Sequence, residues 1–103
     1  MIVHVIAFRF RADDGPGRRA LAAQFCDRLA PLEAAVDEVR SLHLAIDLGR
    51  VDDHFDLVLT STHDRYEDLE AYQNHPLHLE VAAFGRTIVA DRACVDYEVP
   101  PTA

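Results

Sequence analysis

The residues best suited to chemistry lie close together in one short segment of the chain. Tyr72, His75 and His78 fall within seven residues, and Pro76 stands between the two histidines. Because Pro76 cannot continue a preceding helix but fits the first turn of a new one, it predicts a junction between two helices. His78 then lies near the start of the second helix, where the positive end of the helix dipole disfavours a protonated imidazole. A neutral imidazole at this position is suited to act as a general base.

A third histidine, His4, belongs to an N-terminal segment with the alternation of a strand. An aldol closure needs a base that removes a proton next to a carbonyl and a donor that stabilises the enolate oxygen. We predict that His78 is this base and that the hydroxyl of Tyr72 is the donor. Ile6 and Phe8 share a strand face with His4. If helices cover that face, these side chains would bind an apolar substrate and exclude water.

Structural roles are open for the same side chains. Tyr72, on the apolar face of a helix, could be a core aromatic residue whose hydroxyl is bonded to a backbone carbonyl. His75, which precedes a proline, fits a cap or hinge better than a catalyst, and His4 could be a core histidine with its hydrogen bonds satisfied. The geometry of the folded chain decides between these roles.

Metal and cofactor chemistry find little support in the spacing of the residues. His75 and His78 are three positions apart, but Pro76 changes the chain direction between them, and no zinc-site spacing is present. The chain contains no lysine, which excludes Schiff-base chemistry. Near the C-terminus, Arg92 and Asp96 are expected to form a structural ion pair. We therefore predict no metal site and no cofactor.

The overall composition limits the class of partner. A chain of 103 residues is expected to form one domain, residues 1–103. Its net charge is -8 and its ten basic residues are scattered arginines, so neither nucleic acid nor an anionic membrane is an expected partner. Cys26 and Cys94 are far apart and are expected to be free thiols in a reduced compartment. The sequence opens in a strand pattern without signal-peptide features, and no apolar run reaches transmembrane length, so a cytoplasmic location is expected.

Periodic patterns of apolar residues predict the elements that position these groups. Alternation predicts strands over residues 2–10, 39–48, 55–62 and 93–99. Helical spacing predicts helices over residues 18–30, 66–72 and 76–88 and a short helical piece over 32–37, and the segment from Asp64 to Glu67 is typical of a capping box. This order is that of an α+β, ferredoxin-like fold, a four-stranded antiparallel sheet with helices on one face.

The first predicted strand is apolar on both of its faces. Val3, Val5 and Ala7 point away from the side that carries His4 and Ile6. Because helices from so short a chain cover only one face of the sheet, an apolar group is left facing outward. We predict a homodimer in which the same face of a second copy covers this group, so that the two sheets form a barrel.

Several short motifs, spread over nearly the whole chain, resemble those of the stress-responsive A/B barrel (Dabb) family of the dimeric α+β barrel superfamily. The most specific is the string Leu-x-x-Tyr-x-x-His-Pro-x-His from Leu69 to His78. The others are His4-Val5-Ile6-Ala7-Phe8, Asp56-Leu57-Val58-Leu59, and Arg92 with Val95-Asp96-Tyr97. The resemblance implies a dimeric barrel with a cavity between the sheet and the helices.

The resemblance also implies roles for single residues. A plant polyketide cyclase of this family looks like it uses a tyrosine and a histidine for catalysis, at the positions of Tyr72 and His78 in this chain. Its cavity includes a histidine that matches His4. The expected substrate-binding residues of this chain are His4, Ile6, Phe8, Phe25, His75 and Phe84.

Two functions stay open at this point. The first is a cofactor-free acid–base enzyme (polyketide cyclase-like, lyase or isomerase) that acts on a small apolar carbonyl compound. The second is a non-catalytic dimer that binds a small hydrophobic ligand or serves in a stress response.

Overall fold

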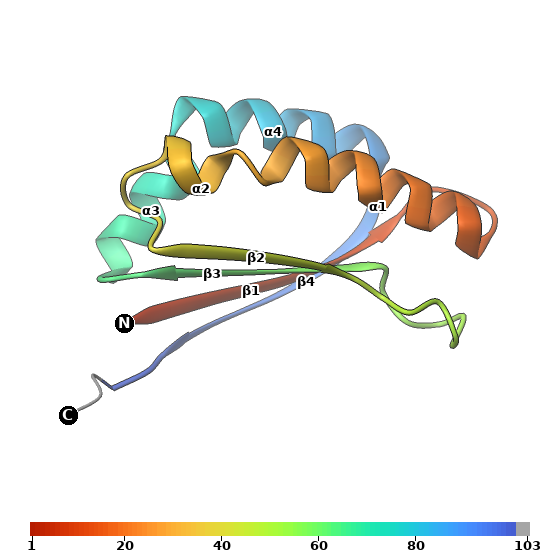
Figure 1. Ribbon diagram of the computed structural model, residues 1–103, viewed down its shortest axis with the longest axis horizontal. Helices are drawn as coiled ribbons and strands as arrows, with labels where there is room; N and C mark the ends of the chain where they lie inside the picture. Colours follow the sequence, from red (N-terminus) through yellow and green to blue (C-terminus); the bar gives the residue numbers. More distant parts are fainter. Residues whose placement is uncertain (101–103) are drawn as a thin grey trace.

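The computed structural model describes residues 1–100 and contains a four-stranded antiparallel sheet with all its helices on one face (Figure 1). The elements in chain order are β1 (Ile2–Phe10), α1 (Gly15–Leu29), α2 (Leu32–Ala35), β2 (Ser41–Ile46), β3 (Leu57–His63), α3 (Tyr66–Asn74), α4 (Pro76–Ile88) and β4 (Val89–Glu98). The strand order is β2-β3-β1-β4, and every neighbouring pair is antiparallel. The predicted ferredoxin-like fold is confirmed.

None of the helices in residues 1–100 combines the length and apolar composition that a bilayer crossing requires.

Strand register determines which side chains meet beneath the helices. In β1, Ile6 is opposite Leu59 of β3 and Cys94 of β4, so these three side chains point to the same face. Phe8 of the same face packs its ring against Phe25 of α1, edge to face, with ring centroids 5.1 Å apart. The face of β1 that carries His4, Ile6 and Phe8 is therefore the one that the helices cover.

The starts of α1 and β4 differ most from the predicted ones, while β2 and β3 each begin two residues later than predicted. α1 begins at Gly15 rather than at residue 18, since the carboxylate of Asp14 caps the helix by accepting a hydrogen bond from the backbone N–H of Gly17 at 2.7 Å. β4 begins at Val89, directly after α4, rather than at residue 93. Its first residues pair with the end of β1 through a register shift between Arg9 and Phe10.

The predicted junction between two helices is present at His75. Its backbone is extended (φ -63°, ψ 137°), which ends α3 and starts α4 with Pro76 in the first turn. The side chain of His75 caps α4, because Nδ1 accepts a hydrogen bond from the backbone N–H of Leu77 at 3.1 Å. The capping box predicted at the start of α3 is wrong. Asp64 instead accepts a hydrogen bond from the guanidinium of Arg40, with Nε at 2.9 Å.

The other face of the sheet has no helix over it in the described chain (Figure 1). Val5 of β1 lies opposite Val95 of β4, and Ala7 lies opposite Ala93. On the edge strand, Val95 is 61% exposed and Tyr97 is 49% exposed. The outward apolar group that the alternation predicts is therefore present on β1 and β4.

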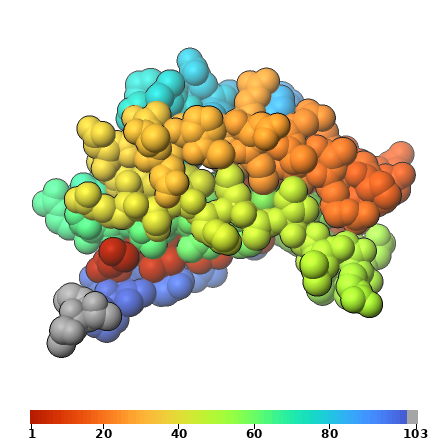
Figure 2. Space-filling model, viewed as in Figure 1, coloured from red at the N-terminus to blue at the C-terminus, as the bar shows by residue number. Residues whose placement is uncertain are grey.

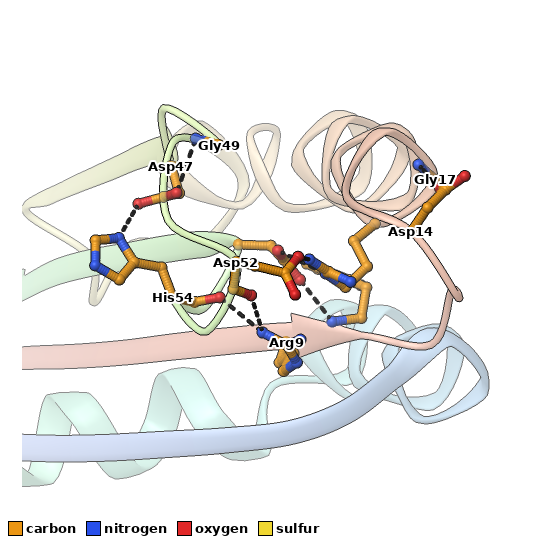
Figure 3. A network of polar contacts seen from close by, with 10 residues as sticks. Arg9, Asp14, Gly17, Asp47, Gly49, Asp52 and His54 are labelled. Atoms are coloured by element: carbon orange, nitrogen blue, oxygen red, sulfur yellow. Dashed lines mark hydrogen bonds and ion pairs between the residues drawn. The ribbon is translucent and has the colours of Figure 1, made fainter.

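A polar network holds the loop between β2 and β3 against the start of α1 and the end of β1 (Figure 3). The guanidinium of Arg18 donates to the carboxylates of Asp52 and Asp56, at 3.1 Å and 3.3 Å. Asp56, which is buried, also accepts from the backbone N–H of Phe10 at 3.0 Å. The guanidinium of Arg9 donates to the backbone carbonyl of Asp52 at 3.2 Å. These bonds lie beside a polar cavity of about 250 Å³, in which Arg18 is paired with Asp52 and Asp56.

Candidate active site

A larger cavity of about 640 Å³ lies between the helices and the sheet. Its walls include Ile6 and Phe8 from β1, Phe25 from α1 and Val81 from α4. The walls also carry the charged residues Arg11, Arg86, Asp91 and Arg92. The volume is in the range of sites for small organic ligands, and such a wall suits a ligand with an apolar body and polar groups.

The cavity brings together six of the eight residues expected in the site. These are His4, Ile6, Phe8, Phe25, Tyr72 and His78. His75 and Phe84 do not line it. His75 caps α4 instead, and Phe84 packs its ring against Phe25 under the guanidinium of Arg28, which lies 4.0 Å from the ring centroid. The helix junction uses His75, and the packing of α4 on α1 uses Phe84, so neither side chain forms part of the cavity wall.

Tyr72 is held by aromatic packing and has its hydroxyl free. The residue is 1% exposed, and its ring lies 4.7 Å from the ring of His78 and 5.4 Å from that of His63, measured between centroids. No backbone carbonyl within residues 1–100 accepts a hydrogen bond from the hydroxyl, so the bond that a purely structural role would use is not formed there. Burial raises the pKa of Tyr72 to about 12, so the phenol keeps its proton and can donate it in a hydrogen bond.

His78 is the third residue of α4 and faces the same cavity. Its Nδ1 is buried and has no hydrogen-bond partner in the described part of the chain. Burial lowers the pKa of His78, an effect that the backbone of Gln73 partly offsets, so the imidazole is neutral near pH 7. A buried polar atom without a partner costs about 1–3 kcal/mol.

His4 is held by a carboxylate from the edge strand. The residue is 6% exposed, and its Nδ1 lies 2.5 Å from Oδ1 of Asp96, its partner across the β1–β4 pair. Because a carboxylate only accepts, Nδ1 carries the proton in this bond. The predicted ion pair between Arg92 and Asp96 is not formed, because Asp96 bonds to His4 while Arg92 lines the cavity. Sγ of Cys94 lies 3.6 Å from the same Nδ1.

His63 supports the site from behind Tyr72 and is not itself in the cavity wall. It is fully buried, with Nδ1 donating to the backbone carbonyl of Glu38 at 2.8 Å and Nε2 accepting from the hydroxyl of Ser61 at 2.9 Å. Both ring nitrogens are therefore used, and burial lowers the pKa of His63. Its role is to hold the ring of Tyr72 in place.

The strand order and the helix-covered cavity define this protein as a ferredoxin-like α+β protein with a candidate site between sheet and helices. The sequence profile described as "Stress responsive A/B Barrel Domain" matches residues 2–99, and the chain belongs to this family. The resemblance stated from the motifs is thereby confirmed. No curated protein matches the chain.

Similar solved structures extend over almost the whole chain. A dimeric ferredoxin-like protein of unknown function from Thermobifida fusca is 28% identical, with a TM-score of 0.79 over 95% of this chain and 90% of that chain. A dimeric protein of unknown function and ferredoxin-like fold from Bacteroides fragilis is 23% identical, with a TM-score of 0.83 over 95% of each chain. A hydroxynitrile lyase from Passiflora edulis is 18% identical, with a TM-score of 0.79 over 99% of this chain and 95% of that chain. The last two likenesses show the fold alone.

Proposed function

We propose that the protein is an acid–base enzyme of the cyclase, lyase or isomerase type that acts on a small, largely apolar carbonyl compound. The observation that carries the proposal is the pair formed by Tyr72 and His78. Their rings are 4.7 Å apart in one cavity, and neither the hydroxyl of Tyr72 nor Nδ1 of His78 is bonded within residues 1–100. Polar groups left without partners beside an apolar cavity are suited to substrate.

In this proposal the neutral imidazole of His78 removes a proton from the carbon next to the substrate carbonyl. The hydroxyl of Tyr72 donates a hydrogen bond to the carbonyl oxygen and stabilises the enolate as charge develops. A positioned base contributes typically about 10²- to 10⁴-fold to the rate, and an oxyanion donor about 10²- to 10³-fold. The apolar walls formed by Ile6, Phe8 and Phe25 would exclude water and strengthen both interactions.

The fold likeness to a protein named as a hydroxynitrile lyase supports the lyase type, because it shows that this scaffold is compatible with such an enzyme. It does not identify the substrate of this chain. Two substrates should therefore be offered to the purified protein, a linear poly-β-ketone for cyclisation and an aromatic hydroxynitrile for cleavage to an aldehyde and hydrogen cyanide. In the cleavage, His78 would take the hydroxyl proton and return it to the leaving cyanide as the C–CN bond breaks.

The test compares turnover by the native protein with turnover by Tyr72→Phe and His78→Ala. Each variant should lower kcat by about 100-fold or more on a substrate that the native protein converts. Tyr66→Phe, at a position 51% exposed and outside the cavity wall, is the matched control and should keep the native rate. Native rates in both cavity variants would remove the pair from the mechanism and overturn the proposal.

A non-catalytic role in binding a small hydrophobic ligand is the second candidate, and the volume and apolar walls of the cavity favour it. A further variant, Phe25→Trp, fills part of the cavity and discriminates the two functions. If the native protein binds an apolar fluorescent ligand, Phe25→Trp loses that binding, and the native protein converts neither substrate, the binding role is supported over catalysis.

We also propose that a second copy of the chain covers the outer face of the sheet. The exposed Val95 and Tyr97 support this, as does the description of two similar structures as dimeric. Val95→Glu should convert the dimer into a monomer in analytical ultracentrifugation, because it places a charge in an apolar contact. A native protein that stays monomeric at micromolar concentration would contradict the dimer.

A further inference from the structure

Three side chains with metal-ligating atoms meet where β1 pairs with the edge strand β4. Nδ1 of His4 lies 2.5 Å from Oδ1 of Asp96 and 3.6 Å from Sγ of Cys94, and Sγ lies 3.9 Å from Oδ1. All three atoms lie within 4.8 Å of one another. The register explains the meeting, because His4 is opposite Asp96 and Cys94 is two residues away on the same face of β4.

We propose that His4, Cys94 and Asp96 form a binding site for a thiophilic divalent metal ion, with Zn²⁺ as the best match. An imidazole nitrogen, a thiolate and a carboxylate are all established Zn²⁺ ligands, and the thiolate disfavours Mg²⁺ and Ca²⁺. Donors at tetrahedral Zn²⁺ lie about 2.0–2.3 Å from the ion, which places them roughly 3.3–3.8 Å from one another. The distance of 3.6 Å from Sγ to Nδ1 of His4 agrees with this spacing, and the distance of 3.9 Å from Sγ to Oδ1 of Asp96 has to shorten slightly.

The third distance has to change when the ion binds. The 2.5 Å contact between His4 and Asp96 is a hydrogen bond, and it opens by roughly 1 Å when both atoms turn to a tetrahedral ion. The side chain of Asp96 is 34% exposed on an edge strand, so its carboxylate has room to rotate. The ion takes the place of the Sγ proton and of the proton on Nδ1. The thiol proton passes to solvent, and the ring proton of His4 moves to Nε2.

The site is accessible and is connected to the cavity. β4 is exposed along nearly its whole length and forms the lower edge of the molecule at the C-terminal end (Figure 2). His4 and Cys94 also line the cavity of about 640 Å³. Three protein ligands leave the fourth position of the ion for water or for a polar atom of a molecule in the cavity. Neither Tyr72 nor His78 is needed to hold the ion, so the site stands independently of the proposed enzyme activity.

The test is a titration of the full chain, prepared with reduced thiols, with Co²⁺ as the spectroscopic substitute for Zn²⁺. A thiolate ligand gives a charge-transfer band in the near ultraviolet, and a tetrahedral site gives intense visible bands. We expect both, with one ion bound per chain, and we expect Zn²⁺ to abolish them by displacing Co²⁺. Calorimetry with Zn²⁺ alone should give the same stoichiometry.

Variants separate this site from other thiols and from the proposed chemistry. Cys94→Ser, at an exposed position, should remove the charge-transfer band, while Cys26→Ser, the matched control on α1, should keep it. Asp96→Asn should weaken Zn²⁺ binding by about tenfold or more. Tyr72→Phe should bind the ion as the native chain does, whatever its activity. A native protein without the thiolate band, or a band that survives Cys94→Ser, would overturn the proposal.

Discussion

Replacing Tyr72 with phenylalanine tests whether the hydroxyl of this residue belongs to the fold or to the site. Tyr72 is 1% exposed, and its hydroxyl is not bonded to any residue in the described range 1–100. A buried hydrogen bond contributes about 0.5–1.5 kcal/mol to stability, and removing a hydroxyl that makes no such bond in the fold forfeits none of it. We therefore expect Tyr72→Phe to unfold with the native free energy or with up to about 1 kcal/mol more. In the same variant, kcat should fall by about 100-fold.

The measurement is urea denaturation followed by circular dichroism, with turnover measured on the same preparations. Tyr72→Ala separates the ring from the hydroxyl, because it removes the contacts with His63 and His78 and should cost about 3–5 kcal/mol. Tyr66→Phe is the control at an exposed tyrosine. If Tyr72→Phe loses more than about 1 kcal/mol, the hydroxyl holds a hydrogen bond in the fold, and the assignment of Tyr72 as an oxyanion donor is refuted.

Three further changes test the surroundings of the site. Gly85→Ala places a methyl group 2.8 Å from Cζ of Phe25, so overpacking of about 1–3 kcal/mol should outweigh a helix-propensity gain of about 1 kcal/mol. A variant with a higher urea midpoint would contradict this. Asp56→Ala leaves the buried Arg18 with only the exposed Asp52 and should cost about 3 kcal/mol, measured in the same way. Because burial lowers the pKa of His63 below its ordinary 6.5, the unfolded chain binds more protons, and the free energy of unfolding should fall as pH drops below about 6.5. His63→Gln should reduce that slope between about pH 7 and 5, and an unchanged slope would show that His63 is not its source.

The order of elements could be predicted because the apolar alternation of the strands is strong and contrasts with the helical spacing of the segments between them. The two-sided pattern of β1 also predicted the uncovered face, since no rearrangement of so few helices could cover Val5 and Ile6 together. Element starts were less predictable, because they depend on single competing hydrogen bonds. The cap by Asp14 starts α1 three residues before the predicted start. Asp64 does not cap α3, because its carboxylate accepts a hydrogen bond from Arg40.

The site was predictable where its residues are local in the sequence. Tyr72 and His78 are separated by one helix junction, and a proline between them restricts the chain enough to indicate that both face the same space. His75 lies in the same segment but does not line the cavity. Its position before Pro76 favours a cap, and its Nδ1 caps α4.

The remainder of the site depends on strand register, which residue types alone do not specify. His4 and Asp96 are 92 positions apart, and they meet only because β1 pairs with β4 in a register that places them opposite each other. A shift of one residue would turn Cys94 and Asp96 to the outer face and leave His4 without its carboxylate. Register in turn is specified by the core, since only this pairing buries Ile6 and Phe8 against Leu57, Leu59 and the helices. The packing of apolar residues therefore determines which polar groups meet at the edge strand, and both the orientation of His4 and the proposed metal site follow from it.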